Sequence, residues 1–296
     1  MATTPALILY WLSSGGSGQF SVPPLQTIAS VPPLPTAVNL FAANMDLMSD
    51  GTVGLTVPDS IWAVIRDGEA KALQQQGIKV LLSIMNNVEQ QLGWSTLTDV
   101  QSTQFASAVA DFLQASGLDG IDIDDEGLGY MPSPSQFYQT VSQIRQRLPT
   151  ILLSNAVYDS QDWEKYSQYP DLITKVNYCC TMAYSDSFSS IVGNVQYFQQ
   201  AGIPLSRLCA GVQAGPANTP CDNGQFTSMA TAQQVAEWAR TNAMGMMLFT
   251  FSQDILEFTA CPQKQPQYKY PNANDHSWQR AIAAALYAHT PQAVAP

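Results

Sequence analysis

The feature that most constrains the fold of this chain is residues 117–126, GLDGIDIDDE, in which acidic residues alternate with isoleucine. Side chains of a β-strand alternate between its two faces, so Asp122, Asp124 and Glu126 would share one face and the isoleucines the other. Such a strand fits a closed barrel, because the isoleucines can pack under surrounding helices while the acids line the inner wall. The stretch therefore predicts a barrel strand that ends in a group of carboxylates.

Crowded carboxylates have a chemical consequence. Residues two apart on one face of a strand lie roughly 7 Å apart at Cα, from a rise of about 3.3 Å per residue, so these acids cannot all ionise freely. One that keeps its proton toward neutral pH can act as a general acid on a leaving oxygen. The alternatives are a calcium loop and a solvated acidic turn, but calcium loops tend to alternate acids with Gly and Asn rather than Ile. The pattern favours a catalytic site.

The spacing D-G-x-D-x-D-x-E over residues 119–126 resembles the signature of family 18 glycoside hydrolases, which include chitinases and endo-β-N-acetylglucosaminidases. A closer resemblance, to bacterial endo-β-N-acetylglucosaminidases of the Endo H type, extends through the first half of the chain. Residues 41–44, FAAN, resemble the second strand of that group, and residues 73–83 resemble its passage from a helix into the third strand. After residue 150 the resemblance is limited to short strand segments.

The resemblance implies roles for the acids of the motif. In family 18 the acetamido group of the substrate replaces an enzyme nucleophile. Glu126 would then donate a proton to the glycosidic oxygen, and Asp124 would hold the N-acetyl nitrogen and steady an oxazolinium-like intermediate. Asp122 would tune Asp124 by sharing a proton, so that the pair titrates as a unit. Asp119 and Gly120 would support the geometry of the strand.

Other positions resemble the family less evenly. Tyr184, in the sequence Met182-Ala183-Tyr184, resembles the tyrosine of a Met-x-Tyr motif whose hydroxyl contacts the acetamide oxygen, although by itself it would be a core or rim tyrosine. Family chitinases usually have Ser-x-Gly-Gly where this chain has Ser-Ile-Met-Asn-Asn at residues 83–87, and a Trp on strand eight where Phe249 or Phe251 falls. We therefore expect a retaining, substrate-assisted endo-glycosidase acting on the di-N-acetylchitobiose core of N-linked glycans. A chitinase, or a non-catalytic chitinase-like sugar-binding protein, is the alternative.

The length of 296 residues suits one α/β barrel. We expect a single catalytic (β/α)8 TIM barrel over residues 1–290 with a tail at 291–296, and an irregular first crossover because residues 22–35 contain five prolines. The predicted strands are residues 6–12, 36–44, 78–84, the acidic strand ending at Glu126, 151–157, 175–184, 207–213 and 246–252, and the predicted helices are 60–76, 104–116, 135–148, 231–242 and 277–289.

Active sites of such barrels lie at the carboxyl ends of the strands, so polar and aromatic residues there are candidate sugar contacts. Each amide alone would be an ordinary loop or capping residue, and each aromatic alone would be ordinary packing. The predicted substrate-binding residues are Asn44, Asn86, Trp94, Tyr130, Asn155, Met182, Gln213, Phe249, Gln253 and Asp254.

Composition excludes several classes of function. With 12 Lys and Arg against 23 Asp and Glu, a formal net charge of -11, a basic face for nucleic acid or anionic lipid is not expected. Only two histidines are present, so the sequence predicts neither a metal site nor a Ser-His-Asp triad, and no cofactor is implied. The expected partner is a glycan or chitooligosaccharide containing N-acetylglucosamine, bound by a monomer. No apolar run reaches the length of a membrane span, and a mature secreted protein is preferred over a cytoplasmic one.

Five cysteines are an odd number for paired disulfides. Cys179 and Cys180 are neighbours on a predicted strand and should face opposite ways, and Cys209 resembles a buried strand residue. Cys221 and Cys261 follow strands seven and eight, which are neighbours in a barrel, so a disulfide between them is predicted.

Overall fold

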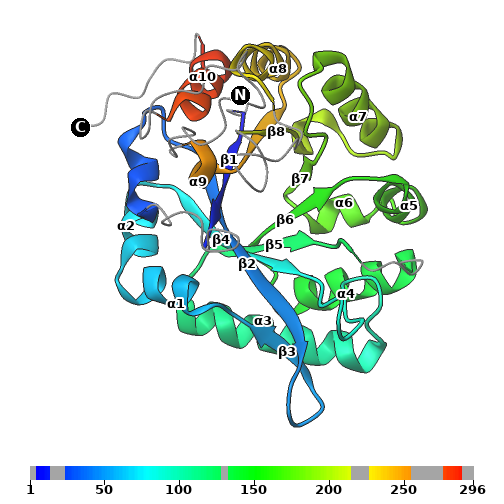
Figure 1. The fold of residues 1–296 in the computed structure, drawn as a ribbon. Coiled ribbons are helices and arrows are strands. Elements are labelled where there is room, and N and C mark those ends of the chain that lie inside the picture. The colour runs from blue at the N-terminus through cyan, green and yellow to red at the C-terminus, as the bar shows by residue number, and fades with distance from the viewer. Residues whose placement is uncertain (1–4, 14–23, 128–132, 215–226, 255–275, 289–296) are drawn as a thin grey trace, which may run out of the picture.

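The fold is a closed barrel of eight parallel strands, seen in a computed structural model that describes residues 5–13, 24–127, 133–214, 227–254 and 276–288 (Figure 1). The strands follow the order β1-β9-β8-β7-β6-β5-β4-β2, and pairing of β1 with β2 closes the ring. Their bounds are β1 Leu7–Leu12, β2 Ala37–Leu47, β4 Lys79–Met85, β5 Gly120–Asp124, β6 Leu152–Val157, β7 Tyr178–Thr181, β8 Leu208–Gln213 and β9 Gly245–Phe249. The predicted (β/α)8 barrel is confirmed.

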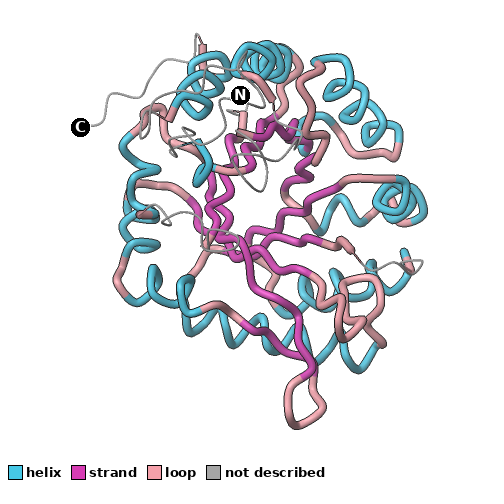
Figure 2. Tube along the Cα trace, in the orientation of Figure 1, coloured by secondary structure: helices cyan, strands magenta, loops and turns pink. Residues whose placement is uncertain are grey.

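The helices surround the barrel, as the outer ring in Figure 2 shows. They are α1 Asp59–Arg66, α2 Glu69–Gln75, α3 Asp99–Ser116, α4 Pro134–Arg147, α5 Ser160–Gln168, α6 Leu172–Lys175, α7 Phe188–Gln200, α8 Met229–Thr241, α9 Phe251–Asp254 and α10 Ser277–Leu286. In the described part of the proline-rich first crossover, from residue 24 on, the chain forms the 3-10 helix Leu25–Ser30 and no α-helix, as expected from the fixed φ and missing N–H of proline. Within the described ranges, no helix is both long enough and apolar enough to cross a membrane.

Local sequence sets the ends of these helices. A capping box between Thr98 and Gln101 starts α3, and Gly117, at φ 69°, ends it. The single helix predicted over residues 60–76 is wrong, because Gly68 adopts φ 80° and divides it into α1 and α2. The strand β3 Val53–Thr56, not predicted as a separate strand, pairs antiparallel with β2 through a turn at Asp50-Gly51.

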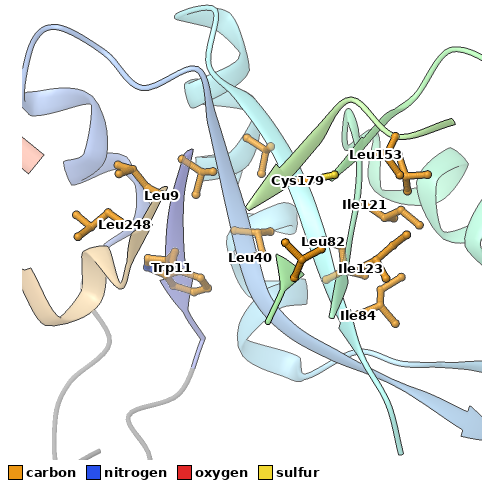
Figure 3. Packing of buried hydrophobic residues seen from close by; sticks show 14 of the residues in the cluster. Leu9, Trp11, Leu40, Leu82, Ile84, Ile121, Ile123, Leu153, Cys179 and Leu248 are labelled. Atoms are coloured by element: carbon orange, nitrogen blue, oxygen red, sulfur yellow. The ribbon is translucent and has the colours of Figure 1, made fainter. Parts of the chain in front are cut away.

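Each strand divides its side chains between two layers. Ile121 and Ile123 lie fully buried between the barrel and the helices, together with Leu82 and Ile84 of the neighbouring strand (Figure 3). A second buried cluster, which includes Ile8, Tyr10, Leu81, Cys180 and Met247, fills the inside of the barrel. This alternation fixes which residues of each strand can reach the mouth of the barrel.

The cysteines follow the same alternation. Cys179 belongs to the outer layer and Cys180 to the inner one, and these two and Cys209 are free and buried. Cys221 and Cys261 lie outside the described residues, as does the predicted tail 291–296, so their disulfide stays a prediction.

Candidate active site

The acidic stretch forms β5, which ends two residues earlier than its alternation predicts. Pairing with β4 stops at Met85 opposite Asp124, so Glu126 follows in the loop and is exposed. Asp122 and Asp124 are 0% and 3% exposed inside the barrel, on the face opposite the isoleucines. Asp119, which precedes β5 at its other end, accepts hydrogen bonds from Lys79 and from the backbone N–H of Val80. Two acids thus line the inner wall, and the third stands at its rim.

Asp122 is enclosed by hydroxyl groups from three strands. Its Oδ2 accepts hydrogen bonds from Tyr10 Oη at 2.8 Å and Ser83 Oγ at 2.9 Å, and its Oδ1 accepts one from Ser154 Oγ at 2.6 Å. Burial raises the pKa of Asp122 to about 6, although these hydrogen bonds favour the ionised form and oppose the shift. This carboxyl can therefore gain or lose a proton near neutral pH.

Asp124 has one carboxylate oxygen, Oδ1, that is buried and has no hydrogen-bond partner in the structure. Burial raises the pKa of Asp124 well above its usual range, and the adjacent carboxyls of Glu126 and Asp122 raise it further. The Asp124 carboxyl thus keeps a proton next to Glu126. A buried oxygen without a partner suits a ligand group that donates a hydrogen bond.

An aromatic cluster lies beside these acids at the mouth of the barrel. The Tyr184 ring stacks on Phe249 with centroids 5.4 Å apart, and Phe249 packs edge-on against Phe41 at 5.6 Å and Tyr10 at 5.8 Å. Burial and the charges of Asp124 and Glu126 raise the pKa of Tyr184, so its hydroxyl remains a hydrogen-bond donor. The structure brings together Tyr184, Phe249 and the three acids, and Met182 lies in the same inner cluster.

A hollow of about 200 Å³ adjoins Glu126. Its lining includes Asn86 after β4, Asp125, and the residues that connect β6 to α5. Tyr158, in that connection, is 57% exposed and presents an aromatic side chain at the edge of the hollow. The hollow joins an acid to polar and aromatic side chains, a combination that suits a sugar ring.

Three predicted sugar contacts lie elsewhere. Trp94 is 0% exposed, packs edge-on against Phe105 and donates from Nε1 to the carbonyl of Ile84, so it is a core residue. Asn155 faces the helix layer, where its Oδ1 accepts a hydrogen bond from Tyr166. The carboxylate of Asp254 accepts hydrogen bonds from the backbone N–H groups of the first turn of α10, at 2.9 and 2.8 Å. These three assignments to the cleft are wrong, because core packing directs Trp94 away from it, the register of β6 directs Asn155 away, and the first turn of α10 holds Asp254.

The remaining predicted contacts have mixed positions. Asn44 is exposed on β2. It pairs with Met85 of β4, which pairs in turn with Asp124, so Asn44 and Asp124 lie at the same height along the barrel. Gln213 ends β8 and is 3% exposed, with a buried Nε2 that has no partner. Asn86 does not point freely into a cleft, since its amide is bonded to the loop that holds Glu126. Tyr130 and the side chain of Gln253 lie outside what the structure describes.

Sequence reasoning missed the residues that contact Asp122. Ser83 and Ser154 are the register partners of Asp122 on the two flanking strands, and Tyr10 reaches across the barrel from β1. Small polar residues inside otherwise apolar strands were the available signal, because a buried hydroxyl needs a partner. Within the described ranges, no group of three or more His, Cys, Asp or Glu side chains is placed to hold a metal ion.

The fold and the site together define the class of protein. It is a (β/α)8-barrel protein with a group of acids at the carboxyl end of one strand, which is where active sites of this fold lie. The chain belongs to the glycosyl hydrolases of family 18, whose family profile matches residues 7–278.

Individual relatives are consistent with this family. The chain is 33% identical over 219 residues to an endo-beta-N-acetylglucosaminidase of Flavobacterium sp. (strain SK1022), an alignment covering 71% of this chain and 63% of that protein. A chitinase from Bacteroides thetaiotaomicron has the same fold, with a TM-score of 0.70 and 14% identity over 99% of this chain and 100% of its own. EndoBT-3987 of the same genus, solved in complex with a Man9GlcNAc2Asn substrate, gives a TM-score of 0.58 and 16% identity over 84% of this chain and 63% of its own.

Proposed function

We propose that this chain is a retaining endo-glycosidase that hydrolyses the β-1,4 bond next to N-acetylglucosamine, with the di-N-acetylchitobiose core of N-linked glycans as its substrate. The observation that supports this most directly is the grouping of Asp122, Asp124 and Glu126 with Tyr184 at the mouth of the barrel. The similarity to an endo-beta-N-acetylglucosaminidase supports the substrate class, and the neighbour that binds Man9GlcNAc2Asn supports an N-glycan.

The proposed mechanism assigns one task to each group. Glu126 gives its proton to the glycosidic oxygen as the bond to the leaving sugar breaks. The acetamide oxygen of the substrate attacks the anomeric carbon and forms an oxazolinium ion, while Asp124 accepts a hydrogen bond from the acetamide nitrogen. Glu126 then takes a proton from the water that opens this ion, which retains the configuration.

The buried pair behind Glu126 makes this cycle possible. A proton on Asp124 limits repulsion between the three acids before substrate binds. For Asp124 to stabilise a cation it has to lose that proton, and Asp122, with a pKa raised to about 6, is placed to share it. The hydroxyl of Tyr184 donates to the acetamide oxygen and orients it for attack.

Chitin is the alternative substrate, and the aromatic floor of the site distinguishes the two. Phe249, rather than Phe251, occupies the mouth, because Phe251 is fully buried in the outer layer. A phenylalanine stacked on Tyr184 offers a smaller surface than the tryptophan expected of chitinases, which favours an N-glycan. A sugar-binding protein without activity is disfavoured, since this chain keeps Glu126.

A side-by-side assay of a high-mannose glycoprotein and chitin oligosaccharides tests the proposal. Release of the glycan with one N-acetylglucosamine left on Asn supports it, cleavage of chitin oligosaccharides alone indicates a chitinase, and binding without cleavage indicates a lectin. Glu126→Gln is expected to lower kcat by about 10²–10⁴-fold, the usual contribution of a general acid. Glu237→Gln, which removes an exposed carboxylate from α8, is the matched control and should keep wild-type turnover. Undiminished turnover by Glu126→Gln would remove the assignment of the acid.

A further inference from the structure

Asp125, the acid at a variable position of the motif, points away from its two acidic neighbours and is fully engaged. Its side chain is 2% exposed. Oδ2 accepts from Lys165 Nζ at 2.6 Å and from Ser95 Oγ, and Oδ1 accepts from Asn86 Nδ2 at 2.8 Å. These donors come from the β4–α3 connection and from α5, so one carboxylate joins two separate segments to the end of β5.

Lys165 is the buried cation of this arrangement. Its side chain is 1% exposed, and Nζ also lies 2.7 Å from Asp162 Oδ1 and 4.4 Å from the ring centroid of Phe137. Burial alone would lower the pKa of Lys165, but the charges of Asp125 and Asp162 raise it overall, so the ammonium stays charged. Buried ion pairs contribute little net stability compared with apolar packing, so their use at one place suggests a need for fixed geometry.

The segment that needs fixed geometry is the loop that holds Glu126. Ladder pairing of β5 ends at Asp124, so the sheet does not hold the backbone of the next residues. The amide of Asn86 donates both to Asp125 Oδ1 and, at 2.9 Å, to the carbonyl of Glu126. One amide group therefore ties the backbone of Glu126 to the anchored side chain before it.

We propose that Asp125 and Lys165 form an ionic anchor that positions Glu126 for proton transfer, which makes Asp125 a positioning residue of the site. The inference rests on the proposed role of Glu126 as the acid. Because both carboxylate oxygens of Asp125 already accept hydrogen bonds from protein groups, its effect passes through the loop rather than through the sugar. Misplacement of a reacting group by about 1 Å can lower a rate by about 10²-fold. Loss of the anchor should therefore lower kcat by about ten- to a hundredfold and leave KM within about twofold.

The chain offers a control at the other end of β5. Asp119, before the start of β5, also accepts hydrogen bonds from a lysine at 2.8 Å, from a glutamine amide at 2.8 Å and from a third donor. Asp125→Asn and Asp119→Asn thus remove lysine-paired carboxylates at opposite ends of β5, although the Lys79–Asp119 pair is the more exposed of the two. The second lies at the amino end of β5, away from the acids, and should leave kcat unchanged.

The test combines kinetics with hydrogen exchange at a temperature where circular dichroism shows each variant to be folded. The expected result is a fall in kcat with unchanged KM, and faster exchange of the amides of Glu126 and Gly127, in Asp125→Asn alone. If Asp125→Asn does not fold, Ser95→Ala, which removes one donor and keeps the ion pair, should show a several-fold fall in kcat and the same local exchange. Equal kinetics and exchange in the two aspartate variants, or in wild type and Ser95→Ala, would overturn the anchor. If wild type cleaves no glycan, the proposed function fails, whereas the exchange of Glu126 and Gly127 still decides whether the anchor exists.

Discussion

The hydrogen bond from Tyr10 to Asp122 allows a pH-dependent test of the site without any substrate. In Tyr10→Phe the buried Asp122 loses one of its three hydroxyl donors, at 2.8 Å, and the ring remains. A hydrogen bond to a charged group contributes about 1.5–3 kcal/mol, and one between neutral groups about 0.5–1.5 kcal/mol. The loss should therefore depend on whether Asp122 is ionised.

The sign and the window follow from the pKa of Asp122. That pKa is raised to about 6 in the folded protein. Between about pH 4 and pH 6 the folded protein therefore binds more protons than the unfolded chain. The free energy of unfolding of the wild type falls as pH rises through this range. The missing hydroxyl favours the protonated form by a further 1–1.5 kcal/mol, or about one pKa unit, so in the variant the fall continues to about pH 7. Tyr10→Phe should lower the free energy of unfolding by about 0.5–1.5 kcal/mol at pH 5 and about 1.5–3 kcal/mol at pH 8.

Urea denaturation at the two pH values measures this difference. Tyr138→Phe is the control, because Tyr138 donates at 2.7 Å to Asp171, whose side chain is 54% exposed. Surface changes usually stay within about 0.5 kcal/mol, so this variant should be nearly neutral at both pH values. An equal loss for Tyr10→Phe at pH 5 and pH 8, or a loss in Tyr138→Phe as large, would refute the assignment of a partly protonated, buried Asp122.

Two further predictions concern the frame of the site. A Cβ at Gly120 would lie 1.9 Å from the carbonyl oxygen of Leu152, so Gly120→Ala should not accumulate as folded protein. Gly193→Ala, in an open position of α7, should instead raise the free energy of unfolding by about 0.5–1 kcal/mol. Thermal melts of the two variants measure this difference, and a wild-type Tm for Gly120→Ala would contradict the packing. Trp94→Phe loses the hydrogen bond to the carbonyl of Ile84, so urea denaturation should show a free energy of unfolding lower by about 1–3 kcal/mol. KM for the glycan should not change. A raised KM with wild-type stability would indicate instead that Trp94 contacts the sugar.

The barrel itself could be predicted because its signals are local. Alternation in residues 117–126 placed Ile121 and Ile123 outward, and the structure has both in the layer under the helices. Prolines before β2 predicted an irregular crossover, and the helix predicted over residues 104–116 ends where α3 ends. The break at Gly68 was missed, since one glycine inside a helical pattern is also compatible with a continuous helix.

The loop after β5 could not be predicted, because the alternating pattern of residues continues to Glu126 and gives no sign that the strand ends at Asp124. The strand stops where its neighbours stop pairing with it, and that depends on β4 and β6 rather than on β5. As a result Asp125 is not an inert outward residue of a strand but the acceptor for Lys165, a residue forty positions away. A lone lysine in a helix gave no indication of this contact.

The error at Asn155 has a physical origin in the sheet. A strand of a parallel barrel is buried on both faces, so its sequence is apolar throughout and does not reveal which residues point inward. Shifting the assignment by one residue exchanges the two faces completely. On β6 the inward residue is Ser154, bonded to Asp122, and its larger polar neighbour Asn155 faces α5. Which residues of β6 point inward follows from β5. The acids of β5 cannot face the apolar layer under the helices, where they would have no partners, so they point inward. Asp122 is in register with Ser154, so Ser154 points inward as well. A strand with buried charges can therefore fix the orientation of neighbours whose own sequences leave it open.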